Sequence, residues 1–254
     1  LWDTDIMSDL DFFSQDCLRY ITSSRLSQKK VLVVGCGNGG DCAPFVEAQE
    51  VHGIDICEDI GQNFIHDKVQ YFQESAESMN RESNYYDLVF SVATLEHIHN
   101  LEAAFAEILR VTKLGGLIYC VAAPLWNSYE GHHTYGVFPE FPWIHLRLSP
   151  EELIHYIEAR EDIGSYTYIG NSTSIEKSKI QDLVSFIFSD YFNRISAETY
   201  LRIADSLDIS YCIRNDIWHE GQALLTSDIL KELQAKGFSQ EELLSVSHTF
   251  VAIK

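Results

Sequence analysis

A glycine-rich loop between two short apolar runs is the feature that most restricts how this chain can fold. Residues 31–34 read Val-Leu-Val-Val and predict a buried strand, and residues 35–40 read Gly-Cys-Gly-Asn-Gly-Gly. Residues 51–55 predict a second strand, which ends in Asp55. Glycine permits a tight turn and lets the backbone come close to a ligand. With a helix-compatible segment at residues 41–49, this order is that of a β-α-β unit with parallel strands.

The purpose of the loop stays open when the loop is considered alone. Its spacing satisfies both Gly-x-Gly-x-x-Gly, the fingerprint of dinucleotide sites, and Gly-x-Gly-x-Gly. Asp55 stands where a carboxylate would accept hydrogen bonds from ribose hydroxyls. The pattern therefore indicates a cofactor that carries a nucleoside, and the alternative is a glycine turn that serves packing only.

Strands and helices continue to alternate up to Pro124. Strands are expected at residues 69–72, 86–92 and 117–123, and a helix is expected at residues 101–111. This alternation calls for a parallel sheet covered on both faces, with right-handed crossovers. The first half of the chain is therefore an α/β structure.

Three further motifs follow the glycine loop in order. They are Tyr-Tyr-Asp-Leu-Val-Phe-Ser at residues 85–91, Leu-Glu-His-Ile at 95–98 and Leu-Arg-Val-Thr-Lys-Leu-Gly-Gly-Leu at 109–117. With these motifs, residues 31–124 resemble the class I S-adenosylmethionine-dependent methyltransferases, in the group that includes ubiquinone-type and sugar methyltransferases. The resemblance implies S-adenosyl-L-methionine as cofactor. It also implies a Rossmann-like, seven-stranded, mostly parallel sheet with an antiparallel last strand, and a helical insertion or cap after strand five.

The resemblance also implies which residues meet the cofactor. In the family, the glycine loop contacts the methionine part, the acidic residue that ends strand two holds the ribose, and the next residue packs on adenine. The cofactor-binding residues implied in this chain are Gly35, Cys36, Gly37, Gly39, Asp55, Ile56, Ser75, Ala76 and Ser91. The chain departs from the family at Val33 and Ser75, where many relatives carry an acidic residue. For Glu96 and His97 we expect helix capping and packing rather than direct chemistry.

The segment after strand five is expected to meet the methyl acceptor, because open α/β sheets bind ligands at the carboxyl ends of their strands. Residues 124–149 carry six aromatic side chains and three histidines without a regular period, which is typical of a lid. His132 and His133 are the candidate catalytic bases, since a neutral imidazole can take a proton from a hydroxyl, with loop hydrogen bonding as the alternative. The candidate substrate-binding residues are Trp126, Tyr129, Tyr135, His145 and Arg147, of which Arg147 has a surface ion pair as its alternative role.

No metal site is predicted from residue spacing. His97 and His99 are two residues apart and would lie on different sides of a helix, and the pair His132 and His133 would need distant carboxylates. The six cysteines show no paired spacing, which argues against a zinc site or a disulfide framework.

Charge and hydropathy exclude several classes of partner. The chain has 18 Lys and Arg against 38 Asp and Glu, a formal net charge of -20, and such a surface repels nucleic acid on average. The longest apolar stretches are too short to cross a bilayer, and no signal-peptide pattern is present. We therefore expect no nucleic-acid partner, no membrane insertion and a cytoplasmic location.

One domain is expected over residues 1–254. Residues 1–124 would be the cofactor-binding core, 125–207 the lid and helical cap, and 208–254 the closing strands. The expected function is methyl transfer to a small polar acceptor, in particular O-methylation of a sugar or glycan precursor, because aromatic faces stack on sugar rings. Residues 132–148 also look similar to methyltransferases associated with bacterial surface-polysaccharide synthesis. Two alternatives stay open: N-methylation of a small amine such as an amino sugar or a phosphoethanolamine-like compound, and a non-catalytic protein that binds the cofactor or a partner. The oligomeric state also stays open, a homodimer included.

Overall fold

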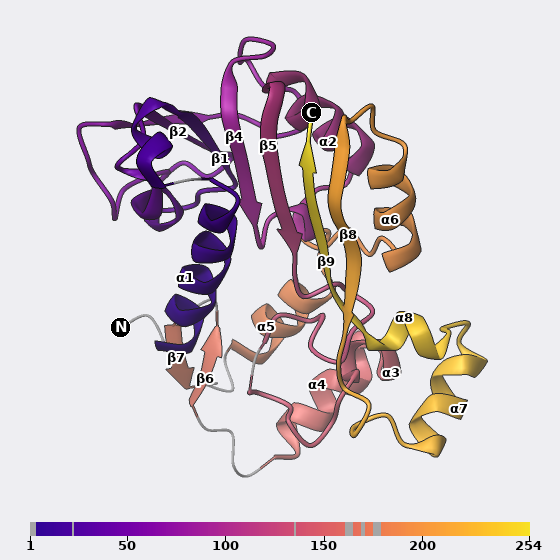
Figure 1. The fold of residues 1–254 in the computed structure, drawn as a ribbon. Coiled ribbons are helices and arrows are strands. Elements are labelled where there is room, and N and C mark those ends of the chain that lie inside the picture. Colours follow the sequence, from indigo (N-terminus) through magenta and orange to yellow (C-terminus); the bar gives the residue numbers. More distant parts are fainter. Residues whose placement is uncertain (1–3, 22, 135, 161–164, 169–170, 175–178) are drawn as a thin grey trace.

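A seven-stranded sheet forms the centre of the molecule (Figure 1). The computed structural model describes residues 4–21, 23–134, 136–160, 165–168, 171–174 and 179–254. The strands of the sheet are β1 (Lys30–Val34), β2 (Glu50–Asp55), β3 (Val69–Gln73), β4 (Tyr86–Val92), β5 (Thr112–Ala122), β8 (Tyr211–His219) and β9 (Ser245–Ile253). Their order is β3-β2-β1-β4-β5-β9-β8. Strands β1 to β5 are parallel, whereas β9 runs antiparallel to both β5 and β8, which confirms the predicted fold class.

The glycine loop follows β1, the strand at which the strand order of the sheet reverses. β1 lies between β2 and β4, so the chain first extends the sheet towards β3 and then returns to add β4 and β5. In register, Val34 of β1 pairs with Ile54 of β2, and Val33 pairs with Phe90 of β4. The carboxyl ends of these three strands therefore share one edge, the position at which open α/β sheets bind ligands.

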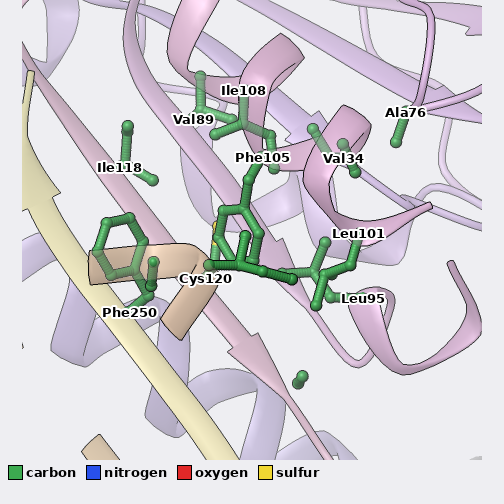
Figure 2. Packing of buried hydrophobic residues seen from close by; sticks show 14 of the residues in the cluster. Val34, Ala76, Val89, Leu95, Leu101, Phe105, Ile108, Ile118, Cys120 and Phe250 are labelled. Atoms are coloured by element: carbon green, nitrogen blue, oxygen red, sulfur yellow. The ribbon is translucent and has the colours of Figure 1, made fainter. Parts of the chain in front are cut away.

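Both faces of the sheet are buried, which explains why its central strands are continuously apolar rather than alternating. Helices α2 (Leu101–Val111) and α6 (Ala197–Asp205) cover one face, where Phe105, Ile118 and Phe250 meet (Figure 2). Helix α1 (Thr4–Arg19) and the short 3-10 helix η2 (Gly40–Phe45) cover the other face. Helix α2 occupies the predicted residues 101–111. The helix expected at residues 41–49 is shorter, because Pro44 has no N–H to continue it.

The segment after β5 forms a separate cluster of side chains at the carboxyl edge of the sheet. Its helices are α3 (Ile144–Arg147), α4 (Pro150–Glu158) and α5 (Ile180–Ile187), and their apolar side chains pack with Trp126 and Phe138. Beside the predicted cap helices it also contains an antiparallel pair of strands, β6 (Ser165–Tyr168) and β7 (Asn171–Ser174).

Two boundaries differ from the expected division of the chain. Helix α6 falls within the expected cap, but its buried residues pack on α2 and the sheet, since its apolar stripe matches the face beside β8 and β9. Between β8 and β9 the chain forms α7 (Ser227–Ala235) and α8 (Gln240–Leu244), which residues 208–254 were not expected to contain. Trp143 is fully buried against these helices, and its Nε1 donates to the carbonyl of Leu243 at 3.1 Å. Short 3-10 helices η1 (Ser23–Gln28) and η3 (Leu95–His97) complete the described elements.

Candidate cofactor and acceptor site

The glycine loop folds back onto the end of β2. The N–H groups of Gly35 and Cys36 donate to the carbonyl of Ile54 at 2.8 and 3.1 Å. The N–H of Gly37 donates to Oδ2 of Asp55 at 2.8 Å. Asp55 also accepts at Oδ1 from the N–H of Cys57 at 3.0 Å. Since each carboxylate oxygen can accept more than one hydrogen bond, Asp55 holds the loop and retains capacity for a ligand hydroxyl.

The glycines of the loop are required for different reasons. A Cβ at Gly35 would lie 2.0 Å from Oγ1 of Thr94, and a Cβ at Gly39 would lie 2.4 Å from the hydroxyl of Tyr71. A Cβ at Gly37 would meet no protein atom within 4 Å, although Gly37 also has a positive φ of 48°. Packing therefore accounts for glycine at positions 35 and 39, whereas the space beside Gly37 is open to a ligand.

Two neighbouring residues extend this open surface. The side chain of Ile56 is 73% exposed directly after Asp55, an apolar face at the end of a buried strand. Asp41 in η2 adds a second carboxylate that sequence reasoning missed, and burial together with Asp55 raises the pKa of Asp41 to about 7. A bound cation would relieve the repulsion between these two carboxylates. The only signal in the sequence was an acidic residue immediately after the glycines.

Other predicted cofactor residues have mostly buried or locally bonded side chains. Cys36 is buried beside Gly53 and Cys42, which leaves its backbone as the part available to a ligand. The Ser75 hydroxyl accepts from the N–H of Glu77 at 3.1 Å, and Ala76 is buried next to it. Ser91 is completely buried within β4. These positions lie at or beneath the carboxyl edge of the sheet, and their contacts with a cofactor stay a prediction.

Glu96, His97 and His133 come together from both sides of this edge. Nε2 of His97 lies 3.8 Å from Oε1 of Glu96, and Nε2 of His133 lies 4.0 Å from the same oxygen. Only 2% of Glu96 is exposed, and burial raises the pKa of its carboxyl to about 7 despite the nearby His97. Sequence reasoning expected capping and packing for Glu96 and His97, because nothing in the sequence indicated that His133 would join them.

The two candidate base histidines point in different directions. His132 is buried against the rings of Phe138 and His145, and its Nδ1 accepts from the N–H of Thr134 at 3.1 Å. His133 has a left-handed φ of 56° and donates from Nδ1 to the carbonyl of Gly131 at 2.8 Å. Burial lowers the pKa of His132 well below its ordinary value and that of His133 to about 4. Both imidazoles are therefore neutral at pH 7.

His132 lines a cavity of about 240 Å³ in the lid. Its lining residues are Tyr129, Glu130, His132, Thr134, Gly136, Phe138, Pro139, Pro142 and Leu224. It offers aromatic faces together with a carboxylate and an imidazole, a combination suited to a small polar ligand.

The remaining substrate-binding candidates are placed as follows. Tyr129 lines the cavity, and Tyr135 lies outside the described residues. Trp126 stacks on Phe192, and its carbonyl accepts from Nε2 of His145 at 2.7 Å. Arg147 pairs with Glu232 of α7 at 3.0 Å, the ion pair that was its alternative role.

Comparison with known proteins agrees with this geometry. Residues 32–120 match the family model described as a methyltransferase domain. A sterol 24-C-methyltransferase of Gibberella zeae is 34% identical over 98 residues, which are 35% of this chain and 26% of that protein. The match thus spans about a quarter of the length of that relative.

Solved structures show the same fold over nearly the whole chain. An S-adenosylmethionine-dependent methyltransferase from Mesorhizobium loti has a TM-score of 0.54 at 14% identity, covering 96% of this chain and 100% of that one. Phosphoethanolamine N-methyltransferase 2 of Haemonchus contortus, solved in complex with S-adenosyl-L-methionine, has a TM-score of 0.52 at 17% identity, covering 96% of this chain and 52% of that one. The fold is that of the class I methyltransferases, whose family binds S-adenosylmethionine. Residues 32–120 therefore combine the sequence pattern of a methyltransferase domain with the fold seen in solved methyltransferases. Among the described helices, none is both long and apolar enough to span a bilayer.

Proposed function

We propose that this protein transfers a methyl group from S-adenosylmethionine to a small polar acceptor held between the glycine loop and the lid. The observation that carries the proposal is the open space beside Gly37, bounded by Asp55 and the exposed Ile56 within the matched domain. Asp55 would accept from the ribose hydroxyls, and Ile56 would pack on adenine. Asp41 would supply negative charge for the cationic cofactor, a part that Val33 cannot play.

For the acceptor we propose a hydroxyl of a sugar or glycan precursor. The cavity beside His132 combines the rings of Tyr129 and Phe138 with polar side chains, as sugar sites do. In the reaction, the acceptor oxygen forms a bond to the methyl carbon while the bond from that carbon to sulfur breaks. The hydroxyl proton passes to a neutral imidazole, that of His132 or His133, and the sulfonium becomes a neutral thioether. Most of the rate enhancement would come from holding the two reactants in line.

N-methylation of a small amine is the second candidate, and Glu130 favours it. This carboxylate lines the cavity beside the Tyr129 ring, an environment that attracts a cationic amine. Burial and Glu220 raise the pKa of Glu130, so a bound cation would restore its charged form. The phosphoethanolamine N-methyltransferase from Haemonchus contortus shares only its fold with this chain, so it does not decide between the two candidates.

Methyl transfer from labelled S-adenosylmethionine, measured against panels of sugars and small amines, tests the function and separates the candidates. If a hydroxyl accepts the methyl group, His132→Ala or His133→Ala should lower kcat by about 10²–10⁴-fold, the usual contribution of a general base. A neutral amine needs no base before attack, so the same substitution should cost much less. His155→Ala, which changes an exposed histidine on α4, is the matched control.

The two ways in which this test can fail are distinct. Cofactor binding without methyl transfer to either panel would favour the non-catalytic alternative. A fall of less than about threefold in both histidine variants, with a hydroxyl acceptor, would reject the base role.

A further inference from the structure

Three hydrogen-bond acceptors converge at the carboxyl end of β4. Glu96 and His97 belong to η3, directly after that strand, and His133 belongs to the lid. Their ligand atoms, one carboxylate oxygen and two ring nitrogens, all lie within 4.8 Å of one another. Glu96 and His97 were expected to serve capping and packing, and His133 was considered as a base, so their meeting needs its own explanation.

The second ring nitrogen of each histidine fixes which way its lone pair points. Nδ1 of His97 lies 3.2 Å from the carbonyl of Tyr191, and Nδ1 of His133 lies 2.8 Å from that of Gly131. A carbonyl can only accept, so each Nδ1 carries the proton. In the neutral imidazoles Nε2 therefore bears a lone pair, and both lone pairs are on the side of Glu96. A bond from the distal ring nitrogen to a backbone carbonyl is the usual orientation of a metal-binding histidine.

The buried carboxylate of Glu96 has few hydrogen-bond partners in the protein around it. Within the described part of the chain, neither of its buried oxygens receives a hydrogen bond of ordinary geometry, and besides His97 only the backbone N–H groups of Glu96 itself and Ala123 lie close enough to lower its pKa. A buried carboxylate without a partner is costly, and it is stabilised by a cation or a proton. A proton shared with an imidazole would need about 2.6–3.0 Å between the heavy atoms, whereas the distances here are 3.8 and 4.0 Å. Two donors bound at about 2.0–2.2 Å from one ion are at most about 4.4 Å apart, so the separations of 3.8 and 4.0 Å suit a metal.

We propose that Glu96, His97 and His133 bind a divalent transition-metal ion. Two imidazoles and one carboxylate favour zinc, iron or cobalt over magnesium and calcium, which prefer oxygen ligands only. This inference replaces the expectation from residue spacing that no metal set is present. That expectation compared positions within each segment, and the set is completed only by the fold.

The surroundings hold these ligands in place. The side-chain nitrogen of Asn193 donates to the carbonyls of Leu95 and Ile98 at 2.7 and 2.9 Å, and the Tyr200 hydroxyl donates to Leu95 at 3.1 Å. These bonds fix the segment that carries Glu96 and His97. Supporting contacts of this kind orient the ligands of metal sites.

Three protein ligands leave coordination positions for water or for an oxygen of the acceptor. Glu96 and His97 follow the carboxyl end of β4, and Asp55 ends β2 at the same edge of the sheet, so the ion would lie at the edge proposed for the cofactor. A metal there would hold an acceptor hydroxyl and ease loss of its proton. Because Nε2 of His133 would then be bound to the ion, His132 would be the imidazole that takes the proton. This use of the ion rests on the proposed function, whereas metal binding itself does not.

The test is metal binding by the full chain after treatment with a chelator. Zn²⁺ and Co²⁺ are titrated by calorimetry, and bound Co²⁺ is followed by its visible absorption, which reports nitrogen and oxygen ligation. We expect one ion per chain and weak or undetectable binding of Mg²⁺. Glu96→Gln, His97→Ala and His133→Ala should each weaken binding by more than the 10–100-fold that is typical for loss of a supporting contact. His99→Ala is the matched control, because His99 is exposed two residues from His97.

Each variant is melted without metal to confirm that it folds, and Glu96→Gln keeps the shape of the side chain if the alanine variants do not. Absence of 1:1 binding in the wild-type chain would overturn the proposal. Equal affinity in His99→Ala and the three ligand variants would overturn it too. Titration of S-adenosylmethionine on the same sample separates the two proposals: cofactor binding without metal binding rejects only the metal, and metal binding without cofactor binding rejects only the proposed function.

Discussion

The cofactor half, residues 30–123, and the lid-and-cap half, residues 124–196, are built by different means. In the cofactor half the central strands β1, β2 and β4 are buried on both faces, so local periodicity determines much of the structure. In the lid-and-cap half, distant side chains hold irregular backbone. Trp143 is fixed by Leu243, and Trp126 by Phe192. The hydrophobic periodicity of the sequence specifies the cofactor half, whereas particular long-range side-chain contacts specify the lid-and-cap half.

The chemistry lies where these halves meet. Glu96 and His97 come from the cofactor half, and His133 comes from the lid. The positions that decide the acceptor are therefore those least constrained by periodicity. Substitutions that disturb one half and spare the other should show how far the two depend on each other.

Gly131→Ala should break the lid and leave the cofactor half folded. Its Cβ would lie 2.0 Å from the carbonyl oxygen of Trp126, a backbone atom that cannot turn away. We expect a cost of about 3 kcal/mol to lid stability, at the upper end of overpacking effects. Hydrogen exchange should show faster exchange in residues 124–149, with affinity for S-adenosylmethionine changed by less than about threefold, under 0.7 kcal/mol.

Gly136→Ala is the matched control for that experiment. Gly136 also has a positive φ, of 70°, but its Cβ would meet no atom within 4 Å, so only the left-handed backbone costs energy, about 1–2 kcal/mol. If Gly131→Ala and Gly136→Ala lowered the stability of the lid by the same small amount, the close approach of Gly131 to the Trp126 carbonyl would be contradicted. Loss of cofactor binding in Gly131→Ala would show that the halves fold as one unit.

Lowering the pH should destabilise the lid and stabilise the cofactor half. Burial lowers the pKa of His145 in the lid to about 3, so its stabilising contribution is complete above about pH 6.5 and is lost as the pH falls towards 3. Burial raises the pKa of Asp41 to about 7, so its contribution is complete below about pH 4 and is lost as the pH rises towards 7. Between pH 7 and 5, His145 alone should cost the lid about 2 kcal/mol.

Hydrogen exchange at pH 7 and pH 5, corrected for intrinsic rates, measures this difference. His145→Gln should reduce the loss in the lid by its own share of about 2 kcal/mol, because its amide nitrogen can replace Nε2 as donor to Trp126 and does not titrate. The lowered pKa values of His132 and His133 leave the rest of the acid response of the lid in place. Equal changes in both halves, or a lid response that is the same size in His145→Gln as in the wild type, would contradict the assignment.

Gly37→Ala sharpens the comparison within the cofactor half. Its methyl group would enter the space proposed for the cofactor, so affinity for S-adenosylmethionine should fall at least about tenfold, or 1.4 kcal/mol. Gly115→Ala carries the same kind of left-handed strain, with φ of 75° and no atom near its Cβ, on a strand remote from the loop. It should melt like Gly37→Ala and bind the cofactor like the wild type. Equal cofactor affinity in the two variants would contradict an open cofactor space at Gly37.

The success of sequence reasoning follows the same division. The strand at residues 86–92 and the helix at 101–111 were predictable, because periodicity and turn residues record burial on the sheet. The antiparallel last strand was expected only from the resemblance to the methyltransferase family. The role of Gly39 was harder to foresee, since it depends on Tyr71, 32 residues away. The meeting of Glu96 with His133 left no local signal at all, because it is produced only by the path of the lid.

Calorimetric titration of S-adenosylmethionine into the wild-type chain and into Asp55→Ala tests the central claim most directly, with NAD as the competing cofactor. S-adenosylmethionine and its demethylated product should bind the wild type, and NAD should not. Loss of charge-assisted hydrogen bonds to the ribose should weaken binding to Asp55→Ala by about 1.5–3 kcal/mol, roughly one to two decades in Kd. Asp55→Asn, whose single amide oxygen can still accept from the N–H of Gly37 or that of Cys57, controls for disorder of the loop. Tight NAD binding without a response to S-adenosylmethionine would contradict the cofactor, and unchanged affinity in Asp55→Ala would contradict the role of Asp55.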